Sequence, residues 1–273
     1  MTIPLTTLHG IVDMPMLGLG VFKTQDGHQV REAVTWALEQ GYRLIDTAAI
    51  YQNERGVGEA IEISGIPRDE IFVTTKLWNT EQGYDTSLAA LSESLERLGM
   101  DHVDLYLIHW PVPDKTEDTW KAMEHLHSEG LARAIGISNF EPHHLDQLMA
   151  NASVAPAVNQ VELHPHLQQT DIRAANAVVG CLTQSWSPLK QGQVLSDETL
   201  LSIASELNVS PAQVAIRWQL QSDIAVIPKS VAKHRIRENR EVFGFALTDD
   251  HMASIAALDV GDRVGPHPDH RDF

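Results

Sequence analysis

The sequence predicts a single (β/α)8 barrel that occupies all of residues 1–273. Short apolar runs alternate with amphipathic helical segments along the chain, and eight such runs can be counted. Eight units in a chain of this length give about 34 residues per unit, which is the spacing of a (β/α)8 barrel. A doubly wound sheet is the alternative that periodicity leaves open. Its dinucleotide motif needs three glycines, and the third is missing from both 18–23 and 56–61.

The elements follow in order from the amino terminus. The segment LTTLHGIVDMP predicts a small β-hairpin that turns at His9 and Gly10. The eight barrel strands are near-continuous apolar runs, typical of a sheet covered on both faces. They are expected at 16–20, 43–48, 71–76, 103–109, 132–138, 157–163, 181–187 and 224–230.

Helix boundaries are also visible. In 86–99, leucines recur on one helical face, and Asp85 or Thr86 is the expected N-cap. Glycines stand where three helices should end, namely Gly41, Gly99 and Gly130. Ser210 followed by Pro211 predicts a further helix start. The polar tail, 261–273, is expected to lie over the barrel mouth.

Composition excludes several classes of function. The chain has 20 Lys and Arg against 37 Asp and Glu, a formal charge of −17. This charge argues against general binding to nucleic acid or to an anionic membrane. Cys181 is the single cysteine and cannot form an intrachain disulfide. Neither a signal-peptide pattern nor a run of about 18 apolar residues is present, so a cytoplasmic protein is expected.

Polar residues end several predicted strands, and in such barrels the reacting groups lie at strand ends. Asp46 ends the second strand, Lys76 the third and His109 the fourth, while Tyr51 follows the second. Each alone has a plain structural interpretation, as a helix cap, a solvated lysine, a structural histidine or a packing tyrosine. Together they form an acid–base set. An ammonium can stabilise a phenolate, a carboxylate can hold the ammonium, and an imidazole can orient a carbonyl oxygen.

These residues lie in motifs that resemble the aldo-keto reductase family. The matching motifs are spread from residue 16 to residue 262. They include DTAAIY with NE in 46–54, TKLW in 75–78, LIHWP in 107–111, GISNF in 136–140, NQVELHP in 159–165 and IPKS in 227–230. Within the family, the chain is most similar to a short microbial branch. That branch includes 2,5-diketo-D-gluconate reductases, methylglyoxal reductases and a prostaglandin F synthase.

The resemblance implies NADPH-dependent reduction of aldehydes and ketones, such as small dicarbonyls or keto sugars. Tyr51 would protonate the substrate oxygen, and Lys76, held by Asp46, would lower the pKa of Tyr51. His109 would orient the carbonyl. A redox-sensing or regulatory NADP-binding subunit with little turnover is the alternative, and the intact tetrad favours catalysis.

The resemblance also implies the residues that hold the cofactor. Ser138, Asn139 and Gln160 would bind the carboxamide, unless they only satisfy neighbouring backbone groups. Trp186 would stack on the nicotinamide. An acidic chain needs a local basic site for a polyanion, and residues 229–240 hold five basic residues against one acidic residue. The expected contacts there are Lys229, Ser230, Val231, Arg235, Glu238 and Asn239, and they predict NADPH over NADH.

The substrate site is expected to be an apolar mouth walled by Phe22, Trp78 and Trp110, with His267 of the tail nearby. The short segment after the seventh strand, 187–198, predicts a partly uncovered cofactor. The paired histidines in 143–144, 164–166 and 267–270 lack a cysteine or acidic cluster at ligand spacing. No metal is therefore expected. The expected partner is a small carbonyl substrate, and the expected state is a monomer.

Overall fold

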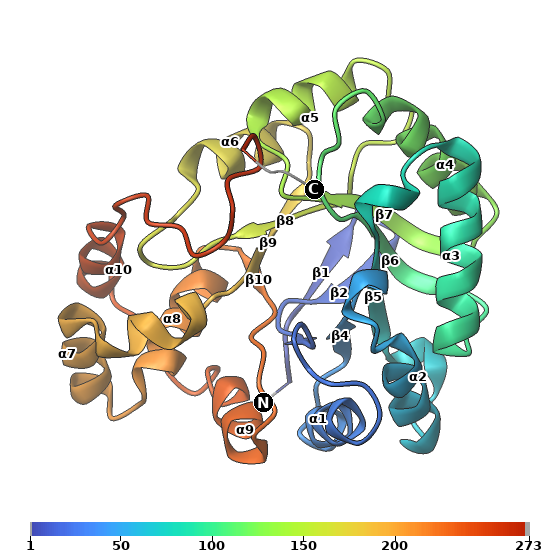
Figure 1. The fold of residues 1–273 in the computed structure, drawn as a ribbon. Coiled ribbons are helices and arrows are strands. Elements are labelled where there is room, and N and C mark those ends of the chain that lie inside the picture. The colour runs from blue at the N-terminus through green and yellow to red at the C-terminus, as the bar shows by residue number, and fades with distance from the viewer. Residues whose placement is uncertain (1, 271–273) are drawn as a thin grey trace.

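The computed structural model describes residues 2–270, and their eight parallel strands form the predicted barrel (Figure 1). Neighbouring strands pair in the order β10-β9-β8-β7-β6-β5-β4-β3. Their bounds are β3 (Leu19–Gly20), β4 (Leu44–Asp46), β5 (Phe72–Leu77), β6 (Val103–Ile108), β7 (Ala132–Ser138), β8 (Val158–Glu162), β9 (Leu182–Trp186) and β10 (Ala225–Val226). The doubly wound alternative is excluded because the two ends of this sheet meet.

Closure of the barrel depends on a few bonds between the first and last strands. Parallel bridges join Leu17 to Val226 and Gly20 to Lys229. The N–H of Gly18 donates to the Val226 carbonyl at 2.9 Å, and the N–H of Gly20 donates to the Pro228 carbonyl at 3.3 Å. The predicted eighth strand, 224–230, is regular only at two residues. Pro228 has no N–H to continue the ladder, so pairing beyond Val226 is reduced to single bridges.

Helices cover the outside of the barrel (Figure 1). Their bounds are α1 (His28–Glu39), α2 (Glu54–Ile63), α3 (Tyr84–Leu98), α4 (Thr116–Ser128), α5 (Pro142–Met149), α6 (Thr170–Val178), α7 (Glu198–Leu207), α8 (Pro211–Gln221), α9 (Lys233–Arg240) and α10 (Asp249–Ala256). Both α7 and α8 lie between β9 and β10, so the seventh unit has one helix more than predicted. Among the described residues, no helix is long and apolar enough to span a membrane.

The helix-boundary predictions are confirmed with one exception. Helix α3 begins at Tyr84 after Gly83, and no side chain caps it. The N-cap predicted at Asp85 or Thr86 is therefore wrong, because both residues lie inside the first turn. Asp85 still meets the partial positive charge of the helix start there. Helix α8 begins as predicted, with the Ser210 hydroxyl accepting from the Gln213 N–H at 3.3 Å.

The predicted hairpin is present as β1 (Leu5–Leu8) and β2 (Val12–Pro15). Its turn places His9 at φ 46° and Gly10 at φ 72°, and Gly10 has no Cβ to oppose that angle. Leu8 and Met14 of the hairpin pack with Leu44, near the start of β4. The hairpin therefore lies across the amino-terminal end of the barrel, where Figure 1 shows it inside the ring of strands. The opposite end stays free for polar groups.

Candidate active site

Four side chains meet at the carboxyl ends of neighbouring strands. Asp46 is the last residue of β4, Lys76 lies near the end of β5, and His109 directly follows β6. Tyr51 ends a 3-10 turn, Ala49–Tyr51, which folds back from β4. Parallel pairing of β4, β5 and β6 places their ends on one rim, as the sequence analysis predicted.

Lys76 connects two of these groups. Its side chain is fully buried, and its Nζ lies 2.5 Å from Asp46 Oδ1, 2.9 Å from the Thr47 carbonyl oxygen and 3.3 Å from the Tyr51 hydroxyl. An ammonium has three N–H donors, so these three acceptors satisfy it completely. The lysine is therefore not solvated, and its charge is held beside the phenol.

Burial and neighbouring charges shift the pKa values of Lys76 and Tyr51. Burial lowers the pKa of Lys76, but the neighbouring Asp46 and Tyr51 outweigh burial and raise it above its usual value. Burial raises the pKa of the Tyr51 phenol, Lys76 opposes this rise, and the pKa of Tyr51 stays above its usual value. The predicted lowering effect of Lys76 is thus present but smaller than the effect of burial. Tyr51 consequently holds its proton at neutral pH and can donate it.

A second network holds Asp46 from across the barrel. Gln160 Nε2 in β8 donates to Asp46 Oδ2 at 2.7 Å and lies 2.8 Å from Gln184 Oε1 in β9. Burial raises the pKa of Asp46, while Lys76 and Gln160 lower it in part. The family resemblance assigns Gln160 to the cofactor, and its motifs do not include Gln184. Strand alternation could have found Gln184, because it lies two positions before Trp186 and so shares its face.

Aromatic rings surround the phenol and the imidazole. The Phe22 and Tyr51 ring centroids lie 4.9 Å apart, and the Trp78 ring meets the His109 ring edge-on at 5.2 Å. The rings of Tyr51 and His109 also meet edge-on, at 5.7 Å. Phe22 is half exposed, with 51% of its surface accessible, whereas Trp110 is buried. The structure thus places Phe22 beside Tyr51 and Trp78 beside His109, as the predicted apolar mouth requires.

Ser138 and Asn139 bond to neighbouring groups in this structure. The Ser138 hydroxyl donates to the Gln160 carbonyl at 2.7 Å, and Asn139 Nδ2 donates to the His109 carbonyl at 2.9 Å. Asn139 Oδ1 accepts from the Trp186 indole N–H at 2.8 Å. The structural interpretation of these residues is therefore supported, while their contact with a carboxamide stays a prediction.

The basic segment, 229–240, is partly neutralised by the fold. Lys233 pairs with Glu39 at 3.0 Å, and Arg237 pairs with Glu241 at 2.8 Å. Lys229 and Arg235 make no ion pair within residues 2–270. All six predicted contacts lie in or before α9, and Asn239 is buried.

The fold brings a further cation, Lys23, close to Lys229. Burial lowers the pKa of Lys229, and so does Lys23, which follows β3. An ammonium whose pKa is lowered by a neighbouring ammonium is stabilised when an anion lies close to it. No sequence signal links Lys23 to Lys229, because barrel closure alone brings the two strand ends together. These donors fit a phosphate group.

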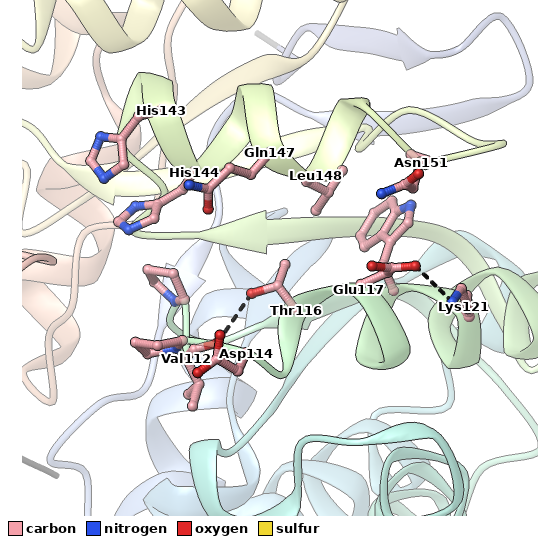
Figure 2. A pocket seen from close by; sticks show the side chains of 14 residues that line it. Val112, Asp114, Thr116, Glu117, Lys121, His143, His144, Gln147, Leu148 and Asn151 are labelled. Atoms are coloured by element: carbon pink, nitrogen blue, oxygen red, sulfur yellow. Dashed lines mark hydrogen bonds and ion pairs between the residues drawn. The ribbon is translucent and has the colours of Figure 1, made fainter.

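One cavity in the described part of the chain lies away from this chemistry. It has a volume of about 630 Å³ between α4 and α5, and Figure 2 shows Glu117 and Lys121 on one side and His143, His144 and Gln147 on the other. None of the tetrad residues lines it. This cavity is therefore separate from the four side chains at the strand ends.

Tertiary structure does bring histidines and an acid together. His143 Nε2 and His144 Nε2 lie 3.2 and 3.4 Å from Asp269 Oδ1. However, the Glu141 N–H donates to His144 Nδ1 at 3.2 Å. That bond places the ring proton on Nε2, which then donates to Asp269 and cannot ligate a metal in the same state. The expectation of no metal site stays a prediction.

The fold and the site define a class: a (β/α)8 barrel whose rim holds a buried lysine bonded to a carboxylate and to a tyrosine hydroxyl. Residues 16–260 match the aldo/keto reductase family. The chain is 52% identical to glyoxal reductase of Bacillus subtilis, over 97% of this chain and 96% of that protein. It is 48% identical to methylglyoxal reductase DkgA of Salmonella typhimurium, over 94% of each.

A solved structure agrees with these relatives. The apo crystal structure of Gox0644 superimposes with a TM-score of 0.96 and 45% identity, covering 100% of both chains. A variant of Gox0644 has been solved in complex with NADPH, with a TM-score of 0.95, 44% identity and the same coverage. The chain therefore belongs to the aldo/keto reductase family, and it is an oxidoreductase.

Proposed function

We propose that this protein reduces small reactive dicarbonyls or keto sugars to alcohols with NADPH, using Tyr51 as the general acid. One observation carries the proposal: Lys76 joins a carboxylate and a phenol in one buried hydrogen-bonded unit. The names of the glyoxal and methylglyoxal reductases support the substrate class, and the NADPH complex of the Gox0644 variant supports the cofactor.

Each residue around the site has its own proposed role in binding or catalysis. Lys23, Lys229 and Arg235 would hold the 2′-phosphate, Trp186 would face the nicotinamide, and the bound cofactor would supply the hydride. His109 would donate to the carbonyl oxygen and orient it. Tyr51 would then protonate that oxygen, and the phenolate left behind would be stabilised by Lys76, whose charge is balanced by Asp46.

Three further proposals concern the exposure of the cofactor, the substrate mouth and the oligomeric state. The segment after β9, Lys190–Ser196, consists of short 3-10 turns with a kink at Gln191 and Gly192, and we propose that it leaves the cofactor partly uncovered and free to exchange. Phe22, Trp78 and Trp110 would wall the substrate mouth, with His267 at its edge. We propose that the enzyme acts as a cytoplasmic monomer.

The decisive experiment is Tyr51→Phe. The phenylalanine keeps the ring that packs on Phe22 and removes only the hydroxyl, so NADPH affinity should stay while methylglyoxal reduction falls by about a thousandfold or more. Fluorescence titration measures the first and NADPH consumption the second. Retained turnover would refute the role of Tyr51. A regulatory subunit would instead show tight NADPH binding without turnover in the unmodified protein.

A cofactor comparison tests the basic site separately. Titration of the unmodified enzyme with NADPH and with NADH should show tighter binding of NADPH, because only NADPH carries the 2′-phosphate. Equal affinities would contradict the phosphate role of Lys229 and Arg235 without touching the role of Tyr51.

A further inference from the structure

One buried carboxylate takes no part in the proposed chemistry. Glu162 is the last residue of β8 and is 1% exposed. Its Oε1 accepts the Val264 N–H at 2.6 Å, and its Oε2 accepts the Gly265 N–H at 2.9 Å. His164 Nε2 lies 3.1 Å from Oε1. Burial raises the pKa of Glu162, but these hydrogen bonds outweigh burial and lower it, so the group is an anion.

The backbone that Glu162 holds belongs to the carboxyl-terminal tail. We call residues 262–265 the strap. Its first residue, Asp262, forms an ion pair with the buried Lys190 of the segment after β9, and Arg263 pairs with Glu141 at 3.1 Å. The strap is thus fastened at both ends and at its centre. It crosses the rim where β8 and β9 end.

The strap packs closely against one aromatic residue, Trp186. A Cβ at Gly265 would lie 2.4 Å from Trp186 Cη2, so the backbone of Gly265 approaches the indole more closely than any other residue type allows. The same Cβ would lie 2.9 Å from Glu162 Oε2. Glycine at this position therefore lets one segment bond Glu162 and cover Trp186 simultaneously.

Trp186 is in turn linked to the catalytic histidine. Its indole N–H donates to Asn139 Oδ1 at 2.8 Å, and Asn139 Nδ2 donates to the His109 carbonyl at 2.9 Å. A continuous path of contacts thus runs from Glu162 through Gly265, Trp186 and Asn139 to the backbone of His109.

We propose that Glu162 is a positioning residue for carbonyl reduction: it fastens the strap on Trp186, and Trp186 holds Asn139 and His109 in place. The proposal rests on the proposed function. A carboxylate suits this role better than an amide, because it accepts from two backbone N–H groups at once. The amide of a glutamine would turn a donor towards one of them.

The test combines Glu162→Gln, Gly265→Val and the double variant in the full-length enzyme. Either single substitution should release the strap and lower kcat/KM for methylglyoxal by about tenfold, and the double variant should be no worse than Gly265→Val alone. Glu206→Gln is the matched control, since Glu206 is exposed and bonds only to His251 within residues 2–270. It should leave kcat/KM unchanged.

A spectroscopic reading separates positioning from general stability. In protein labelled with 5-fluorotryptophan, the fluorine NMR resonance of Trp186 can be assigned because it is lost in Trp186→Phe. This resonance should shift in Glu162→Gln and should not shift in the Glu206→Gln control. If Glu162→Gln does not fold, Glu162→Asp keeps the charge with a shorter reach and should show a smaller shift and a smaller loss of kcat/KM.

Two results would overturn the proposal. One is an unchanged Trp186 resonance with unchanged kcat/KM in the folded variants. The other is multiplication of the two single effects in the double variant, which would mean that Glu162 does not act through the strap. An unmodified enzyme that consumes no NADPH would refute the proposed function instead, and the Trp186 resonance would still report on the strap.

Discussion

Replacing Lys76 by methionine should destabilise this protein more than a typical buried substitution. The side chain is fully buried and satisfied by three acceptors, one of which is the Asp46 carboxylate. Methionine fills a similar volume but leaves Asp46 buried without its cation. Gln160 remains as the one side-chain donor to that carboxylate within residues 2–270.

The size of the effect follows from this geometry. Removing one partner of a buried ion pair costs about 3–5 kcal/mol in the free energy of unfolding. For a chain of 273 residues, average unfolding entropies convert this cost into a drop in Tm of about 5–9 °C. Adding Asp46→Asn should recover most of the loss, since the double variant has no buried charge at this position.

The pH dependence supplies a second check with a defined sign. Burial already raises the pKa of Asp46, and without Lys76 it should rise further. Folded Lys76→Met then binds a proton more tightly than the unfolded chain, so its stability relative to the unmodified protein should increase as the pH falls from 8 to 5.

Denaturant unfolding of the single and double variants measures both effects, and circular dichroism confirms the fold at each pH. A Lys76→Met protein as stable as the unmodified one, with no dependence of the difference on pH, would refute the buried ion pair.

Two further predictions concern catalysis. Because the pKa of Tyr51 is raised, the rate of reduction should stay level through neutral pH and fall only in alkaline solution, while alcohol oxidation should accelerate as the pH rises; pH profiles of kcat in both directions check this. A rate of reduction that already declines at neutral pH as the pH is raised would contradict this prediction. Because Lys23 adds to the field at Lys229, Lys23→Ala should weaken NADPH binding severalfold and NADH binding little. Titration at low salt measures this, with Lys121→Ala as the surface control.

The barrel could be predicted from local patterns because each unit repeats the same physical signal. A strand covered on both faces must be apolar throughout, and a covering helix must be apolar on one side. The predicted strand at 132–138 coincides with β7, whereas β10 is much shorter than 224–230. Pro228 lies within that run and interrupts the ladder, whereas pairing with the first strand depends on barrel closure, which a local pattern does not contain.

The tetrad could also be predicted from the sequence, since Asp46, Lys76 and His109 each end a strand and parallel strand ends share one rim. The balance of charges around it could not be predicted in this way. Sequence counts gave five cations in 229–240, but Glu39 and Glu241 neutralise two of them in space. The net pKa of Tyr51 likewise depends on burial, which opposes Lys76 and is known only from packing.

The sequence by itself therefore determined the number of units, the rim and the chemistry of the groups on it. Tertiary structure alone decided how those groups are held. Gln160 reaches Asp46 across 114 positions of the chain, and Val264 reaches Glu162 across 102. Such contacts form only when the barrel closes and the tail folds back over it. No periodicity records them, because each depends on the geometry of the whole ring.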